Sequence, residues 1–258
     1  MDKNLRAAIQ RADRYVRNKA YLCLFPGCTK LAIRSHAIQR ATIVEALAEN
    51  GVIYTLNQTF NYLMKVTSSA IPMDVVETGV NEASVFPGFC AEHDSAVFSA
   101  AEKTPVKRTV SLSLHLRALS FEYCRRRRTA DFDRKLSKLT RDATVRQEFG
   151  RKADLWEKTN EVFKDLYIGS MFAGVDAVEY ILIPIARNLQ VSCCGCFQHA
   201  KTFDSVIAYN VISFADCSLV ALTTFKVVER HLHDFLADYH LPSDIGRLGA
   251  CPSNARRA

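Results

Sequence analysis

The spacing of apolar residues along the chain separates helical segments from extended ones. Leu112, Leu116 and Leu119 recur at intervals of four and three, the period of an amphipathic helix. The same spacing, together with cap positions such as Gly51 after a helical run, defines the other helical segments. We predict helices over residues 3–20, 37–50, 91–101, 109–127, 131–166 (broken near Gly150) and 226–239.

Short apolar runs without helical spacing predict strands. Three of them lie in the first part of the chain, over residues 21–25, 31–33 and 52–56. Two longer stretches, residues 181–197 and 206–225, are rich in Val, Ile, Cys and Phe and also predict strands. The sequence therefore predicts an α+β protein. We place a boundary near residue 103, with a module over 1–103 and, over 104–258, a helical arm followed by a β-containing C-terminal domain.

Charge adds one feature to this picture. The formal net charge is a modest +7, but cations gather between residues 103 and 128, and this segment ends in Arg125, Arg126, Arg127 and Arg128. Such a run can bind nucleic acid by contacting its phosphates. It can equally be a solvated helix end, where cations interact favourably with the helix dipole.

Localisation is predicted from what the sequence lacks. The first twenty residues are charged throughout, without the apolar stretch of a signal peptide, and we find no uncharged apolar run long enough for a membrane span. We therefore expect a cytoplasmic protein that does not associate with membranes. Its nine cysteines should then be thiols, metal ligands or buried small residues rather than disulfides.

Two short pairs of metal-ligating residues stand out. Cys23-x4-Cys28 flanks a Pro26–Gly27 turn, and Cys90-x2-His93 opens a predicted helix. Zinc prefers four tetrahedral ligands drawn from thiolate and imidazole, commonly supplied as two such pairs. The entropic cost of closing the long loop between them grows slowly with its length. We predict one structural Zn²⁺ site; the alternative is that the cysteines are core residues and that the histidine caps a helix.

With these pairs in place, residues 20–100 resemble the HNH (ββα-metal) endonuclease superfamily. The resemblance rests on the Cys-x4-Cys knuckle and on two further segments. Ser35-His36-Ala37-Ile38 stands where the family often shows Asp-His-Ile, and Phe89-Cys90-Ala91-Glu92-His93-Asp94 stands where it often ends Cys-x2-Cys-His. The resemblance implies a zinc-stabilised ββα module.

The resemblance also implies roles for individual residues. His36 would be the general base, and His93 would replace the last knuckle cysteine. Asp94 would stand where the family has its final metal-binding histidine, and Asn81 is the best candidate for the middle asparagine. The chain departs from the family pattern in the serine before His36 and in this final aspartate.

The implied chemistry is metal-dependent hydrolysis of phosphodiester bonds in DNA or RNA. A neutral imidazole such as His36 can deprotonate water near pH 7, and Mg²⁺ or Mn²⁺ held by the hard oxygen of Asp94 would stabilise the developing charge. A closed four-ligand zinc site would be structural. Simpler roles remain open, because His36 could cap a helix and Asp94 could interact with the helix dipole.

Other functions remain open. The pattern Ser-His-x-Ile-Gln-Arg followed by Gly-Phe-Cys-x2-His-Asp also resembles a group of bacterial proteins, some associated with phage defence. The chain could instead be a non-catalytic zinc module that binds nucleic acid or a protein. The C-terminal domain could bind a protein partner, mediate homo-oligomer formation or carry the activity itself.

A second cysteine cluster lies in the C-terminal half of the sequence. Cys193, Cys194 and Cys196 with His199 could form a second metal or redox site. Adjacent residues on a strand point to opposite faces, so all three cysteines cannot share one face. We therefore expect them to be buried small residues rather than ligands.

Overall fold

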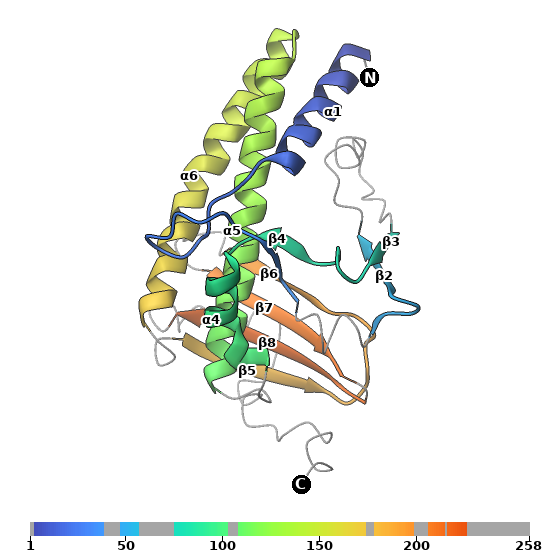
Figure 1. The fold of residues 1–258 in the computed structure, drawn as a ribbon, viewed down its shortest axis with the longest axis vertical. Coiled ribbons are helices and arrows are strands. Elements are labelled where there is room, and N and C mark those ends of the chain that lie inside the picture. The colour runs from blue at the N-terminus through green and yellow to red at the C-terminus, as the bar shows by residue number, and fades with distance from the viewer. Residues whose placement is uncertain are drawn as a thin grey trace.

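The computed structural model describes residues 3–38, 47–56, 75–102, 108–173, 178–198, 206–214 and 216–225. Within these residues the chain is a mixture of helices and antiparallel sheets, so the α+β prediction is confirmed (Figure 1). The helices in this part of the chain are α1 (Lys3–Asn18), α4 (Ala91–Glu102), α5 (Arg108–Leu139) and α6 (Ala143–Ala173).

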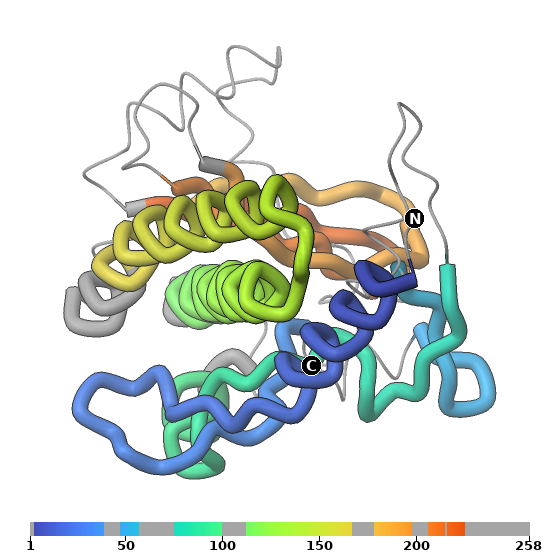
Figure 2. Tube along the Cα trace, turned by 90° about the horizontal axis from the view of Figure 1, so that it is seen from above, coloured from blue at the N-terminus to red at the C-terminus, as the bar shows by residue number. Residues whose placement is uncertain are grey.

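The long helix α5 lies at the centre of the molecule. Figure 2 shows it end-on, with α6 and a four-stranded sheet on one side and α4 with the N-terminal segment on the other. His115 on α5 is buried against the sheet, where its Nδ1 lies 3.0 Å from the hydroxyl of Thr223. Phe132 and Leu136 pack against Ile9 of α1 in a separate apolar cluster. Helix α5 therefore contacts each major part of the fold.

The helical arm is divided at neither predicted place, which lay at residues 128–130 and near Gly150. Helix α5 continues to Leu139, and α6 begins at Ala143 and runs through Gly150 without interruption. Asp142 causes the new start, because its Oδ1 accepts a hydrogen bond from the N–H of Val145 at 3.1 Å, as an N-cap does. A single glycine costs a helix only about 1 kcal/mol, so Gly150 does not end it.

The C-terminal half forms one antiparallel sheet. Each predicted extended stretch contains two strands, because a turn interrupts it. The strands are β5 (Val178–Ile185), β6 (Cys193–Gln198), β7 (Val206–Ser213) and β8 (Ser218–Phe225), in the order β5-β8-β7-β6. The predicted helix over residues 226–239 lies outside the described residues.

The N-terminal half contains two small antiparallel pairs. The strand β1 (Arg34–His36) pairs with β4 (Val85–Pro87), and β2 (Val52–Leu56) pairs with β3 (Val75–Gly79). The strands predicted over 21–25 and 31–33 reduce to an isolated bridge between Leu22 and Leu31. Most of the helix predicted over 37–50 lies outside the described residues.

Apolar contacts join the two halves of the chain. One buried cluster contains Phe89 and Phe98 from the N-terminal half, Leu119 from α5, Phe163 from α6 and Val206 from the sheet. Phe89 and Phe98 meet edge to face, with ring centroids 5.2 Å apart. The core therefore extends across residue 103, where the sequence predicted a domain boundary.

Candidate metal centre

The first ligand pair lies on a tight loop between α1 and β1. The N–H of Cys28 donates to the carbonyl of Phe25 at 3.0 Å, which closes a turn around Gly27. Gly27 has φ +77°, a left-handed conformation that glycine adopts without steric cost. The N–H of Cys23 donates to the carbonyl of Lys30 at 2.9 Å, so both ends of the loop are fixed. This backbone geometry turns both thiols toward one point.

The second pair lies where α4 begins. Cys90 precedes the helix and its carbonyl accepts the N–H of Asp94 at 2.9 Å, the first bond of the helical ladder. His93 follows three residues later, which places it on the same side of the helix. The two ligand loops are joined by a hydrogen bond from the N–H of Leu24 to the carbonyl of Gly88 at 2.9 Å.

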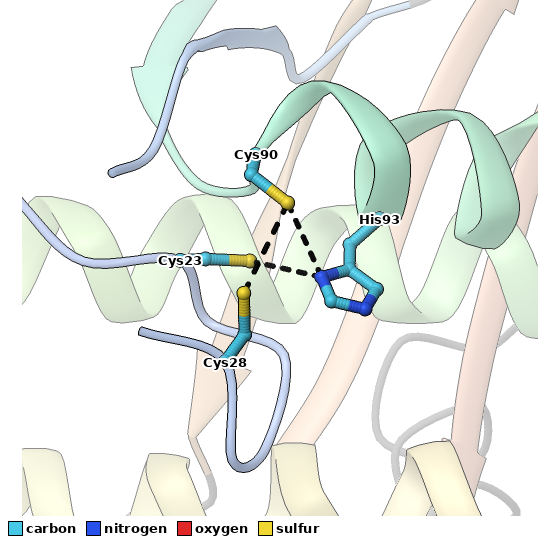
Figure 3. Close-up of side chains that lie close together, drawn as sticks. All are labelled: Cys23, Cys28, Cys90 and His93. Atoms are coloured by element: carbon cyan, nitrogen blue, oxygen red, sulfur yellow. Dashed lines mark hydrogen bonds between the residues drawn. The ribbon is translucent and has the colours of Figure 1, made fainter. Parts of the chain in front are cut away.

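The four side chains converge, as Figure 3 shows. Nδ1 of His93 lies 3.2 Å from Sγ of Cys90 and 3.5 Å from Sγ of Cys23, and Sγ of Cys28 lies 4.0 Å from Sγ of Cys90. A tetrahedral zinc ion with ordinary bond lengths would separate its ligands by about 3.8 Å (S to S) and about 3.6 Å (S to N). These three separations are within about 0.4 Å of that geometry, and all four donor atoms lie within 4.8 Å of one another.

The surroundings act in opposite directions on two of the thiols. The N–H of His93 hydrogen-bonds to the sulfur of Cys90 and lowers the pKa of that thiol. Burial instead raises the pKa of Cys23, as expected for a thiol that would ionise only on binding a cation. Phe25 stacks on the ring of His93, with centroids 3.9 Å apart and an interplanar angle of 1°. This aromatic contact was missed at the sequence level, although Phe25 lies inside the knuckle.

These observations define a Cys3His group able to hold one metal ion, and its donors suit zinc. All four positions of a tetrahedral ion would be filled by protein, so the ion would be structural. An ion pair between Lys30 and Glu92, with Nζ and Oε2 2.5 Å apart, further links the two ligand segments on the surface.

His36 lies at the end of β1, next to this centre. Its Nδ1 lies 3.1 Å from the carbonyl oxygen of Ala83, so the neutral ring donates from Nδ1 and carries its lone pair on Nε2. Asn81 is exposed in the turn that also contains Ala83. The structure thus brings the predicted base and the predicted asparagine to one end of the β1–β4 pair.

Asp94 lies in the first turn of α4, directly after the ligand His93. Its side chain is half-buried, and its Oδ1 is shielded from solvent with no hydrogen-bond partner. A buried, unsatisfied carboxylate oxygen is costly unless a cation or a donor satisfies it. This oxygen is therefore able to accept a metal ion or a proton donor.

The four predicted nucleic-acid-binding arginines have different environments. Arg125 is exposed, whereas Arg126 is buried and donates to Glu122 at 2.8 Å. The guanidinium of Arg126 also lies 3.9 Å from the ring centroid of Phe163 on α6. Arg127 and Arg128 are half-buried. Arg126 thus contributes to helix packing, and the more accessible guanidinium of the run is that of Arg125.

Among the described residues, the cysteines of the sheet show no second metal centre. Within the part of the chain that the structure describes, Cys193, Cys194 and Cys196 are not gathered as metal ligands, and His199 lies outside it. Burial raises the pKa of Cys194 to about 12. Cys217 is disulfide-bonded, so the expectation of no disulfides is wrong at this position.

None of the helices in the described part of the chain combines the length and the apolar character that a membrane span requires. No family model, curated protein or solved structure matches this chain. What the chain does must therefore be inferred from its own residues.

Proposed function

We propose that the chain is a metal-dependent nuclease of the HNH type, in which a structural zinc ion holds the catalytic segments in place. The observation that carries the proposal is the position of His36. It ends the first of two antiparallel strands, and the second strand, β4, leads through Cys90 into α4. This order of strand, strand and helix, with zinc ligands beside it, is what the resemblance implies.

Two hydrogen bonds to the backbone of Phe89 support the proposal by fixing His36 relative to α4. Oγ of the buried Ser35 accepts a hydrogen bond from the N–H of Phe89 at 3.2 Å. The N–H of Ile33 donates to the carbonyl of Phe89 at 2.6 Å. Because Phe89 directly precedes the ligand Cys90, β1 is coupled to the metal centre. A zinc ion would therefore restrict the position of His36 without contacting it.

The proposed chemistry assigns one task to each residue. Nε2 of His36 takes a proton from the attacking water, while the carbonyl of Ala83 keeps the ring in the required tautomer. Oδ1 of Asp94 fits a divalent cation because it is buried and unsatisfied. Mg²⁺ or Mn²⁺ would supply charge stabilisation at the phosphate. Asn81, exposed beside Ala83, would help to orient the substrate.

The test is cleavage of plasmid DNA, single-stranded DNA and RNA with Mg²⁺ or Mn²⁺. His36→Ala should keep its zinc and its fold but lose about a hundredfold or more in rate, the usual scale of general-base catalysis. Asp94→Asn should also lose activity and require more metal. The matched control is Glu92→Gln, which removes an exposed carboxylate from the same helical turn together with its exposed ion pair to Lys30. Because an exposed ion pair contributes little to stability, this variant should leave the rate unchanged.

Three results would contradict the proposal. A wild-type protein that cleaves none of these substrates with either metal would be a binding module rather than a nuclease. Cleavage that survives His36→Ala would reject the assigned base. Zinc loss or early melting of His36→Ala would show that the histidine is structural.

A further inference from the structure

A pocket of about 380 Å³ lies between α1 and α5, away from the metal centre. Both helices contribute to it, and they lie side by side in Figures 1 and 2. The pocket is lined by Arg11, Arg14, Tyr15, Asn18, Lys19 and Lys135. Four of its six lining residues are therefore cations, and none is acidic.

Most of this positive charge is not neutralised. Lys19 forms an ion pair with Asp131, with Nζ and Oδ1 2.6 Å apart. Among the described residues, Arg11, Arg14 and Lys135 have no carboxylate partner. Three like charges around one hollow raise each other's energy, and an anion would relieve this repulsion.

The charge continues beyond the pocket along α1. Lys3 and Arg6 are exposed on the same helix, as is Arg17. The acidic residue of α1, Asp13, is buried and paired with Arg17. The exposed surface of α1 therefore carries cations over its whole length, so the partner is better described as an extended polyanion than as a single anion.

An aromatic ring completes the pocket. Tyr15 is 40% exposed, and Nζ of Lys135 lies 4.8 Å from its ring centroid while Nζ of Lys19 lies 5.9 Å from it. Proteins that bind single-stranded nucleic acid combine cations that follow the backbone with aromatic rings on which bases stack. A half-exposed tyrosine between lysines provides both elements.

We propose that this α1–α5 basic pocket binds single-stranded nucleic acid through its phosphates and one stacked base. The proposal rests on the proposed function in taking a nucleic acid as the polyanion. A nucleic acid fits better than a bilayer surface, since an exposed aromatic ring lies among the cations and no aliphatic side chain that could insert into a bilayer is among the lining residues. It also fits better than free phosphate, which would leave the outer cations of α1 unused.

The test measures binding of fluorescently labelled single-stranded DNA and RNA to the full chain, without added Mg²⁺ or Mn²⁺. The double variant Arg11→Glu/Arg14→Glu should bind at least tenfold more weakly. Its salt dependence, as the slope of log K against log salt, should fall by about 1.4, since each lost single-strand phosphate contact contributes about 0.7. Tyr15→Ala should weaken single-strand binding, whereas Tyr15→Phe should keep it.

The matched control is Arg151→Glu/Lys152→Glu on α6, which changes the net charge by the same amount. Both residues pair with Glu148 outside the pocket, so this variant should keep most of the affinity. Circular dichroism and zinc content should show that both double variants are folded. Equal losses in the two variants, or no loss in the pocket variant, would overturn the proposal.

Two further binding measurements identify the ligand. Vesicles of anionic phospholipid and inorganic phosphate are tested beside the oligonucleotides, and binding of either in preference to single strands overturns the proposal. The experiments also distinguish failure of the pocket proposal from failure of the nuclease proposal. Wild-type protein that binds through the pocket but never cleaves rejects only the nuclease function, and cleavage unaffected by loss of the pocket cations rejects only the pocket.

Discussion

At the scale of single residues, the metal centre is set up by backbone hydrogen bonds more than by the ligands themselves. Cys28 is placed by its N–H bond to Phe25, and Cys90 by its position at the start of α4. The thiol of Cys90 lies where backbone N–H groups converge, which favours its ionised form. The site is therefore nearly preorganised, and most of the remaining cost of binding is the deprotonation of the thiols.

A zinc measurement tests this centre. Purified protein should carry about one zinc per chain, since four converging ligands of this kind bind tightly. Cys90→Ser should lose the metal and unfold at a lower temperature. The control is Cys124→Ser, because Cys124 is a buried thiol outside the centre and its loss should leave the zinc content unchanged. Well-folded wild-type protein without metal would refute the prediction.

A second prediction concerns pH and the buried His115. Burial lowers the pKa of His115 to about 4, against an ordinary value of 6.5. Between these two values the unfolded chain binds this proton and the folded chain does not, so stability is lost as the pH falls through about 6.5 toward 4. The loss should be on the order of 3 kcal/mol.

Urea unfolding at pH 7.5 and at pH 4.5 measures this contribution. His115→Asn keeps a polar group near Thr223 but cannot titrate, so the difference between its two free energies of unfolding should be smaller than that of the wild type. Equal pH dependence in the two proteins would show that folding does not lower the pKa of His115.

At the scale of elements, α5 shows why a run of charges in the sequence does not by itself identify a binding surface. A run of four arginines predicts a charged surface, yet the helical period turns neighbouring residues to different sides. Arg126 faces α6, where it bonds to the buried Glu122 and lies over Phe163. Arg125 faces solvent while reaching back to the same glutamate, with Nη2 and Oε1 2.6 Å apart.

The two arginines should therefore respond differently to truncation. Arg126→Ala removes a buried guanidinium from Glu122 and its contact with Phe163, and should cost about 2–4 kcal/mol. Arg125→Ala removes a partly exposed ion pair and should cost less than about 1 kcal/mol. Urea denaturation of both variants gives the comparison, and similar costs would contradict the assigned environments.

The sequence predicted some elements well for physical reasons that are local. Helices α1 and α4 follow from helical spacing, and the two ligand pairs follow from short, chelating separations. The helix start after Asp142 was not predicted, because an N-cap depends on the contact of a single side chain. The sequence instead suggested a break at Gly150, because glycine has a low helix propensity. The basic pocket was missed because Lys135 joins Arg11 and Arg14 only when α1 and α5 pack together.

At the scale of the whole molecule, the metal centre belongs to a core shared by both halves of the chain. Cys23 and Cys90 are themselves buried in the cluster that contains Leu119 of α5 and Phe163 of α6. Without the metal, these thiolates would repel one another or take up protons. The loops that carry them would then be held less firmly. We therefore expect the loss of zinc to lower the stability of α6, although no ligand lies on that helix.

Trp156 makes this expectation measurable. It is the single tryptophan of the chain, it is half-buried on α6, and its ring centroid lies 5.8 Å from the guanidinium of Arg126. Its emission therefore reports the helical arm rather than the metal loops. If the core is shared, a strong chelator should lower the midpoint of urea unfolding seen by Trp156. The loss should be on the order of 4 kcal/mol when free zinc had been about a thousandfold above its Kd.

The control is Cys28→Ser, which should already unfold at low urea and should not respond to the chelator. Circular dichroism followed in the same samples should give a single transition that coincides with the emission of Trp156. If the chelator removes zinc and changes the circular dichroism while the Trp156 transition stays in place, residues 1–103 unfold separately and the predicted domain boundary is real. A shift of both signals together means that zinc stabilises the whole chain, because the apolar cluster around Phe163 transmits the loss of the metal to the arm.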